Sequence, residues 1–161
     1  MRHESPNLRF MPHDFTSQLQ KAEQACLQNG TQLTPLRREV LELILKAHTP
    51  LTAYQLLDQL KLLRKSAVPP TIYRALEFLL ENQLIHKIER LNAFVPCVEN
   101  DHHHHNDAQF LICKQCCAVQ EIEDHAISAA LAKAAAAQGF VTSRAMVELD
   151  GICAACAAKP A

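Results

Sequence analysis

Two Cys-x-x-Cys pairs, Cys113/Cys116 and Cys153/Cys156, constrain this chain more than any other feature of its sequence. Four thiolates in two short clips can complete a tetrahedral shell around one zinc ion. The segment between the pairs, residues 117–152, has room for a helix and a long strand. A zinc ion held by all four sulfurs would therefore join the two ends of a small domain. A single pair is also compatible with a redox motif, but neither pair follows a thioredoxin-like strand.

Length and cysteine usage limit the class of protein. A chain of 161 residues holds one medium domain or two small ones. No apolar run approaches the ~18 residues of a membrane span, and the polar N-terminus, broken by Pro6 and Pro12, is unlike a signal peptide. Seven cysteines, an odd number grouped as metal clips, fit a reducing compartment better than a disulfide scaffold. We therefore expect a cytoplasmic protein.

Charge divides the chain into two halves. Residues 1–98 contain twelve Lys and Arg against nine Asp and Glu, a net charge of +3, whereas residues 99–161 contain four against eight, a net charge of −4. A mildly basic half joined to an acidic half rich in metal ligands indicates two different tasks. The basic excess alone is only a weak sign of nucleic-acid binding.

The first half has the apolar periodicity of helices. We expect helices over residues 16–29, from Thr34-Pro35, from the candidate N-cap Thr52, and over residues 71–82 after a proline-rich entry. Residues 84–88 and 93–98 alternate as two strands around a turn at residues 89–92. Helices followed by such a hairpin predict a winged helix-turn-helix.

The second half predicts a small mixed unit. Residues 99–107, which include His102 to His105, have no regular pattern and are expected to form a hinge or linker. Short strands are expected over residues 109–112 and 118–122, an alanine-rich helix over 128–138, and a strand over 140–149. Such a unit is too thin to bury a large core alone, so it needs a metal, a partner subunit, or both.

Tyr73 and Arg74, on the expected fourth helix, are the best candidates for reading DNA, with Thr71 at its start. An exposed arginine near the start of a recognition helix can bond guanine or a phosphate, and tyrosine can contact a phosphate or a thymine methyl. A solvated Arg and a half-buried Tyr on an ordinary helix fit the spacing equally well. Further candidates for phosphate contacts, which surface solubility explains equally well, are Arg37, Arg38, Lys61, Arg64 and Lys65.

A second set of potential metal ligands lies outside the four cysteines. His86 and Cys97 stand on opposite arms of the expected hairpin, which would bring them close together. His105 lies in the linker, and Glu121 follows the first cysteine pair. One Cys, two His and one Glu can form a zinc shell of mixed softness. Each also has an ordinary interpretation, as a surface His, a buried Cys or a solvated Glu.

Several motifs together resemble the ferric uptake regulator family. They are Leu33-Thr34-Pro35-x-Arg37, Ala53-Tyr54-x-Leu56-Leu57, and Pro70-Thr71-Ile72-Tyr73-Arg74-Ala75-Leu76-x-Phe78-Leu79. Three more are most similar to the family's zinc uptake regulator branch: His86-Lys87-Ile88-Glu89, Phe110-Leu111-Ile112-Cys113, and Gly151-Ile152-Cys153-x-x-Cys156. The similarity runs from about residue 17 to residue 157, nearly the whole chain.

The resemblance implies a homodimeric transcription factor that represses zinc-uptake genes, binds a palindromic double-stranded DNA operator, and uses zinc as co-repressor. It implies no enzyme activity, no membrane partner and no small-molecule substrate. Two zinc ions per subunit are implied. The structural zinc is then held by Cys113, Cys116, Cys153 and Cys156, and the regulatory zinc by His86, Cys97, His105 and Glu121.

The expected fold is therefore α+β, an N-terminal winged helix-turn-helix joined by a hinge to a small αβ dimerisation domain. Its parts are a disordered or frayed extension at residues 1–16, a winged-helix DNA-binding domain at 17–98, a His-rich hinge at 99–108, and a zinc-stapled dimerisation domain at 109–161.

Some features depart from the family pattern. The spacing from His105 to Cys113 is one residue longer than expected, so His103 and His104 are alternative ligands, and Cys117 stands where the family usually has Gly. A Cys ligand at position 97 favours zinc over iron or manganese. The alternative functions are a sister regulator that senses another metal or peroxide, and a zinc storage or delivery protein. A zinc hydrolase is disfavoured because the sequence has no His-Glu-x-x-His motif.

Overall fold

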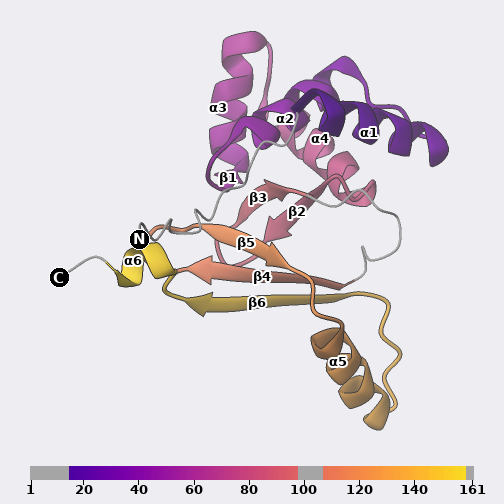
Figure 1. Ribbon diagram of the computed structural model, residues 1–161. Helices are drawn as coiled ribbons and strands as arrows, with labels where there is room; N and C mark the ends of the chain where they lie inside the picture. The colour runs from indigo at the N-terminus through magenta and orange to yellow at the C-terminus, as the bar shows by residue number, and fades with distance from the viewer. Residues whose placement is uncertain (1–14, 98–106, 159–161) are drawn as a thin grey trace. The chain divides into compact units, whose positions relative to one another are not determined.

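The computed structural model of this chain describes residues 15–97 and 107–158. These ranges belong to two compact units, here called the helical unit (15–97) and the sheet unit (107–158), and each is considered by itself (Figure 1). Within these ranges no helix is both long and apolar enough to cross a membrane. Nearly all of the expected N-terminal extension, most of the expected hinge, and His105 lie outside the described residues; Phe15, Thr16, Asp107 and Ala108 already belong to regular elements.

The helical unit contains four helices and a three-stranded antiparallel sheet in the order β1-β3-β2 (Figure 1). The helices are α1 (Phe15–Gln28), α2 (Pro35–Lys46), α3 (Ala53–Leu63) and α4 (Pro69–Glu81), and the strands are β1 (Leu51–Thr52), β2 (Ile85–Ile88) and β3 (Ala93–Pro96). The expected hairpin is present as the antiparallel pair β2 and β3. Strand β1 was not expected, because two residues are too few to show an alternating pattern.

Local signals explain where the helices begin. Thr52 caps α3 with a capping box, in which its Oγ1 accepts from the Gln55 amide at 3.3 Å and its own amide donates to the Gln55 side chain at 2.8 Å. Helix α4 begins at Pro69, two residues before the expected Thr71, because proline fits the first turn of a helix. Gly30, the second residue after the end of α1, has a φ of 68°, which glycine adopts without strain.

One hydrophobic cluster fills the helical unit. All four helices contribute to it, and the side chains of Leu56, Leu60 and Leu79 are fully buried. Leu51, Ile85 and Phe94 extend it to the three strands. The core therefore fixes α4 against α2 and α3, which sets the direction in which the exposed side of α4 faces.

The sheet unit is a three-stranded sheet in the order β5-β4-β6, with one longer helix (Figure 1). Its elements are β4 (Asp107–Cys113), β5 (Val119–Ile122), α5 (His125–Ala137), β6 (Ala145–Gly151) and α6 (Ala154–Ala157). Strand β4 pairs antiparallel with β5 and parallel with β6. The mixed helix-and-strand class and its division into a helical and a sheet part match the expected α+β fold.

Two boundaries in the sheet unit differ from the expectation. The strand expected over residues 140–149 begins only at Ala145, which lies opposite Asp107 in the parallel register with β4. Helix α5 begins three residues before the expected Ser128, since the Asp124 carboxylate caps it by accepting from the Ala126 amide at 2.8 Å. The four-residue α6 was not expected.

The core of the sheet unit is small. Phe110, Ile112 and Val119 are buried, but α5 has no buried residue. The start of α5 is tied to β4 by Gln109, whose Nε2 donates to the Asp124 carbonyl at 2.9 Å and to the Ser128 hydroxyl at 3.1 Å. The hydrogen bonds of Gln109 therefore connect the start of α5 to the sheet.

Candidate metal centre and nucleic-acid interface

The four cysteines of the two Cys-x-x-Cys pairs meet at one end of the sheet unit. The parallel register of β4 and β6 places Cys113 beside Gly151, so the chain leaves both strands at the same edge. Cys116 follows in the turn after β4, and Cys153 and Cys156 lie at the start and inside of α6. The four Sγ atoms all lie within 4.8 Å of one another. Sequence spacing predicted this group correctly.

Backbone hydrogen bonds hold the two cysteine turns together. The Cys153 amide donates to the Cys113 Sγ at 3.4 Å, and the Lys114 amide donates to the Gly151 carbonyl at 2.9 Å. Within the first turn, the Cys117 amide donates to the Cys113 carbonyl at 3.0 Å. The sulfurs are thus positioned by the same ladder that pairs β4 with β6.

The donor set fits a zinc ion. Zn–S bonds of about 2.3 Å in a tetrahedron put neighbouring sulfurs about 3.8 Å apart. Cys116 Sγ and Cys153 Sγ are 3.7 Å apart. All seven cysteines of the chain are free thiols, so no disulfide competes for these sulfurs.

The thiols of this group titrate very differently. Backbone N–H groups directed at the Cys113 sulfur, first among them that of Cys153, lower the pKa of this thiol to about 6. The neighbouring sulfurs of Cys153 and Cys116 raise the pKa of Cys156 to about 12. Four ionised sulfurs at these distances repel one another, and a divalent cation among them removes that repulsion. The chemistry of the group is therefore that of a closed metal-thiolate site.

His86 and Cys97 lie together in the helical unit. His86 is on β2, and Cys97 follows β3, with its amide donating to the Leu84 carbonyl at 3.1 Å. A ring nitrogen of His86 and the Cys97 Sγ lie within 4.8 Å. Their exposed fractions are only 3% and 5%. The hairpin brings the pair together as expected, and the interpretation of His86 as a surface histidine is wrong.

The other two residues of the expected second site are placed differently. Glu121 belongs to the sheet unit, where it is half-buried on β5 opposite Phe110. His105, with its alternatives His103 and His104, lies outside the described residues. The structure thus brings one pair of this ligand set together, and the full set stays a prediction.

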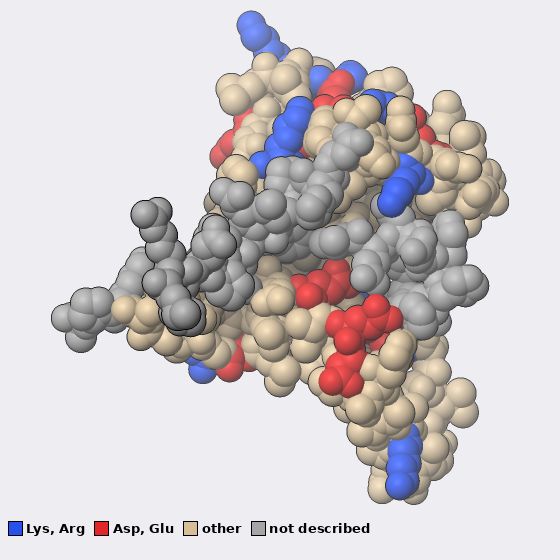
Figure 2. All heavy atoms as spheres, viewed as in Figure 1, with Lys and Arg blue, Asp and Glu red and all other residues tan. Residues whose placement is uncertain are grey.

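The exposed side of α4 carries the expected DNA-reading residues. Tyr73 is 51% exposed and Arg74 is exposed, while Thr71 is half-buried in the first turn. Lys65 is exposed in the loop before α4. In Figure 2, Lys and Arg side chains are interspersed with Asp and Glu over the helical unit, and a group of Asp and Glu side chains lies on the sheet unit.

Two of the cations proposed for phosphate contacts are engaged with carboxylates. Arg64 forms a bidentate ion pair with Glu39, in which its Nε and Nη2 donate to the two carboxylate oxygens at 2.6 and 2.8 Å. This contact lowers the pKa of Glu39. Arg38 forms ion pairs with Glu23 and Glu42. These arginines join neighbouring helices, so their role as phosphate contacts is weakened relative to the other candidates.

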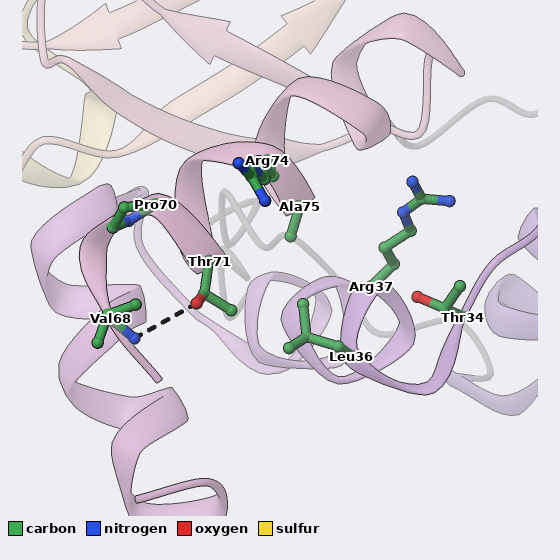
Figure 3. Close-up of a pocket in the computed structure, with 8 residues that line it drawn as sticks. All are labelled: Thr34, Leu36, Arg37, Val68, Pro70, Thr71, Arg74 and Ala75. Atoms are coloured by element: carbon green, nitrogen blue, oxygen red, sulfur yellow. Dashed lines mark hydrogen bonds between the residues drawn. The ribbon is translucent and has the colours of Figure 1, made fainter. Parts of the chain in front are cut away.

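Sequence reasoning missed a hollow beside α4, which measures ≈ 290 Å³. It lies where α2 and α4 both begin, and Figure 3 shows Arg37 and Thr34 on the α2 side and Arg74 and Thr71 on the α4 side. The Arg37 guanidinium stands 3.6 Å from the centre of the Phe78 ring of α4. The sequence signals both helix starts, at Thr34-Pro35 and Val68-Pro69. It does not show that the two starts lie beside the same hollow.

Known proteins share both the sequence and the fold of this chain. The family model described as the ferric uptake regulator family matches residues 28–150. The zinc uptake regulation protein of Escherichia coli is 41% identical over 138 residues, which cover 86% of this chain and 80% of that protein. A solved zinc uptake regulator complexed with zinc and DNA is 38% identical with a TM-score of 0.84, covering 89% of this chain and 95% of its own. The crystal structure of holo XcZur is 42% identical with a TM-score of 0.78, covering 89% and 99%.

Proposed function

Since this chain belongs to the ferric uptake regulator family, we propose that it is a zinc-responsive, sequence-specific DNA-binding repressor of zinc-uptake genes, with zinc as co-repressor. One observation carries the proposal, the likeness along 89% of the chain to a zinc uptake regulator complexed with zinc and DNA. The protein acts as a homodimer on a palindromic operator in the cytoplasm, and it is a regulator rather than an enzyme.

The structural zinc ion is held by Cys113, Cys116, Cys153 and Cys156. The 3.7 Å separation of two of these sulfurs and the low pKa of Cys113 support this assignment. Four protein sulfurs complete the tetrahedron and leave no open position for a substrate or an activated water. This site therefore stabilises the fold and performs no chemistry.

The regulatory zinc ion is held by His86, Cys97, His105 and Glu121, which gives two zinc ions per subunit. The burial of His86 beside Cys97 supports half of this ligand set. The four ligands come from the helical unit, the hinge and the sheet unit, so an ion that binds all four couples these parts. Moving a conformational balance from 1:99 to 99:1 takes about 5.5 kcal/mol, while structural zinc sites reach about 10–16 kcal/mol. A sensing site that binds zinc less tightly than a structural site does can therefore still supply the energy for this conformational shift.

Helix α4 is the recognition helix of this proposal. Tyr73 and Arg74 face the bases or the nearby phosphates of the major groove, with Thr71 at the helix start. Arg37 and Lys65 contact phosphates, which sets the position of α4 but carries no sequence information. Zinc controls the spacing of the two recognition helices of a dimer, and hence the fit to a two-fold operator.

The sheet unit supplies the dimer contact. Apolar side chains on and after α5 are exposed in the single chain, among them Leu131, Phe140 and Val141, and α5 buries none of its residues. Exposed apolar surface of this kind marks a protein interface. A second copy of the chain covers it in this proposal.

Zinc-buffered capture of genomic DNA by the purified protein tests the function. We expect enrichment of palindromic fragments with zinc and none with a chelator or with manganese or iron in its place. Cys97→Ser should leave a folded dimer and abolish zinc-dependent operator binding, whereas Cys117→Ser, which changes an exposed thiol, should bind as the wild type does. Unchanged DNA affinity of Cys97→Ser would contradict the regulatory site, and no DNA binding by the wild type at any zinc level would contradict the function.

A further inference from the structure

The hollow between α2 and α4 has the size and lining of a site for a small anionic group. Its volume of ≈ 290 Å³ is just below the range of about 300–1,000 Å³ found for drug-sized ligand sites. Arg37 and Arg74 line it from different helices, together with the hydroxyls of Thr34 and Thr71, and none of its lining residues is a carboxylate (Figure 3). A phosphate group matches this chemistry better than a metabolite-sized ligand does.

The two arginines differ in how they are held. Arg37 Nη1 donates to the Gln32 carbonyl at 2.8 Å, and its guanidinium stands 3.6 Å from the Phe78 ring centre. A guanidinium has five N–H groups, so one bond to Gln32 leaves further donors for an anion. Arg74 is exposed on α4 and projects from it separately (Figure 3). Arg37 is therefore already ordered at the hollow, whereas Arg74 is available to reach a base.

We propose that Arg37 binds a phosphate of the operator backbone at this hollow, and that Phe78 is a positioning residue that holds the guanidinium there. Phe78 is only 8% exposed and lies on α4 itself. Its ring stacks under a cation from α2, so the phosphate bound by Arg37 keeps a fixed position relative to α4. Ordering Arg37 before binding also lowers the entropy that DNA binding must remove. This inference rests on the proposed function.

Affinity measured over a range of salt concentrations tests the contact. With zinc-loaded protein and an operator fragment from the capture experiment, Arg37→Ala should weaken binding roughly ten-fold and reduce the slope of log K against log salt by about 0.9 for each bound subunit. Non-specific DNA should lose the same factor, whereas Arg74→Ala should weaken operator binding selectively. Lys21→Gln, which removes one charge from an exposed position on α1, is the matched control and should leave both quantities unchanged.

A double-mutant cycle tests Phe78. Phe78→Leu should weaken operator binding about three-fold, Phe78→Tyr should restore it, and Phe78→Leu should have no further effect when Arg37→Ala is already present. Melting curves identify any loss of folded protein, and Phe78→Tyr keeps the test valid if Phe78→Leu unfolds. An unchanged salt slope in Arg37→Ala, or an equal loss from Phe78→Leu in both backgrounds, would overturn the inference. Either result leaves zinc-dependent binding by the wild type, and with it the proposed function, intact.

Discussion

The helical unit and the sheet unit are stabilised in different ways. In the helical unit, four helices and three strands share one buried apolar cluster. In the sheet unit, few side chains are buried, and a helix of thirteen residues, α5, buries none. The helical unit, to which we assign the reading of DNA, has an apolar core of its own. We expect the sheet unit to depend on bound zinc and on a partner copy.

The four-cysteine group lies where that dependence is greatest. It connects the turn after β4 to α6 after β6, so it joins both ends of the sheet unit. Structural zinc sites supply about 10–16 kcal/mol at neutral pH, which is as large as the total stability of about 5–15 kcal/mol of a typical domain. We therefore expect zinc at the proposed four-cysteine site to contribute more to the stability of the sheet unit than its small apolar core does.

We expect the largest effect from the loss of one proposed zinc ligand. Cys156→Ser removes a buried sulfur from the group and should unfold the sheet unit while the helical unit keeps its helices. We expect calorimetry to show only the transition of the helical unit, and circular dichroism to retain most of the helical signal. Zinc analysis should show one ion fewer per subunit.

Cys117→Ser is the matched control for this prediction. Cys117 is adjacent to the same turn but is exposed and does not belong to the four-sulfur group. It should keep both transitions. Retention of the sheet-unit transition in Cys156→Ser would show that the apolar core and the partner copy are sufficient, and would break the comparison between the two units.

The next largest effect concerns the core of the helical unit. Leu79 is fully buried on α4, and Leu79→Ala should lower the free energy of unfolding of the helical unit by about 2–5 kcal/mol, because the cavity cannot close completely. Chemical denaturation followed by far-ultraviolet circular dichroism measures the change. The sheet-unit transition should not move, since Leu79 belongs to the core of the helical unit.

Leu62→Ala is the control for Leu79→Ala, because it truncates a leucine that is exposed rather than buried. Leu62 lies on α3 and is 85% exposed, so its removal should change the free energy of unfolding by no more than about 0.5 kcal/mol. Equal effects of the two substitutions would show that the buried cluster does not dominate the stability of the helical unit.

Helices and turns that have local sequence signals could be predicted from the sequence. Strand pairings between segments far apart in the sequence could not. The apolar period and the caps at Thr52 and Gly30 located the helices within a few residues. The strand expected from residue 140 begins only at Ala145, because an apolar alternation does not show which of its residues pair with the distant strand β4. No local pattern reveals the start of a distant partner.

The candidate sites divide in the same way. The cysteine spacing predicted the four-sulfur group, since metal-binding turns bring their own ligands together. The burial of His86 was not predicted, because one histidine in a strand pattern does not show how far packing will cover it. The stacking of Arg37 on Phe78 joins residues of two helices, and neither residue alone signals the contact.

The smallest expected effect is that of the ion pair between α2 and the end of α3. Arg64 hydrogen bonds lower the pKa of Glu39, so the folded carboxyl ionises below its ordinary value. A lowered folded pKa stabilises the folded state above the ordinary carboxyl pKa, and this stabilisation is lost as the pH falls through the folded value. Because both side chains are partly exposed, Glu39→Gln should lower the melting temperature of the helical unit only slightly at neutral pH. The difference from the wild type should vanish in acid.

Glu77→Gln, at an exposed position on α4, is the control and should show no difference in melting temperature at either pH. A Glu39→Gln difference that persists in acid would assign the loss of stability to packing rather than to charge.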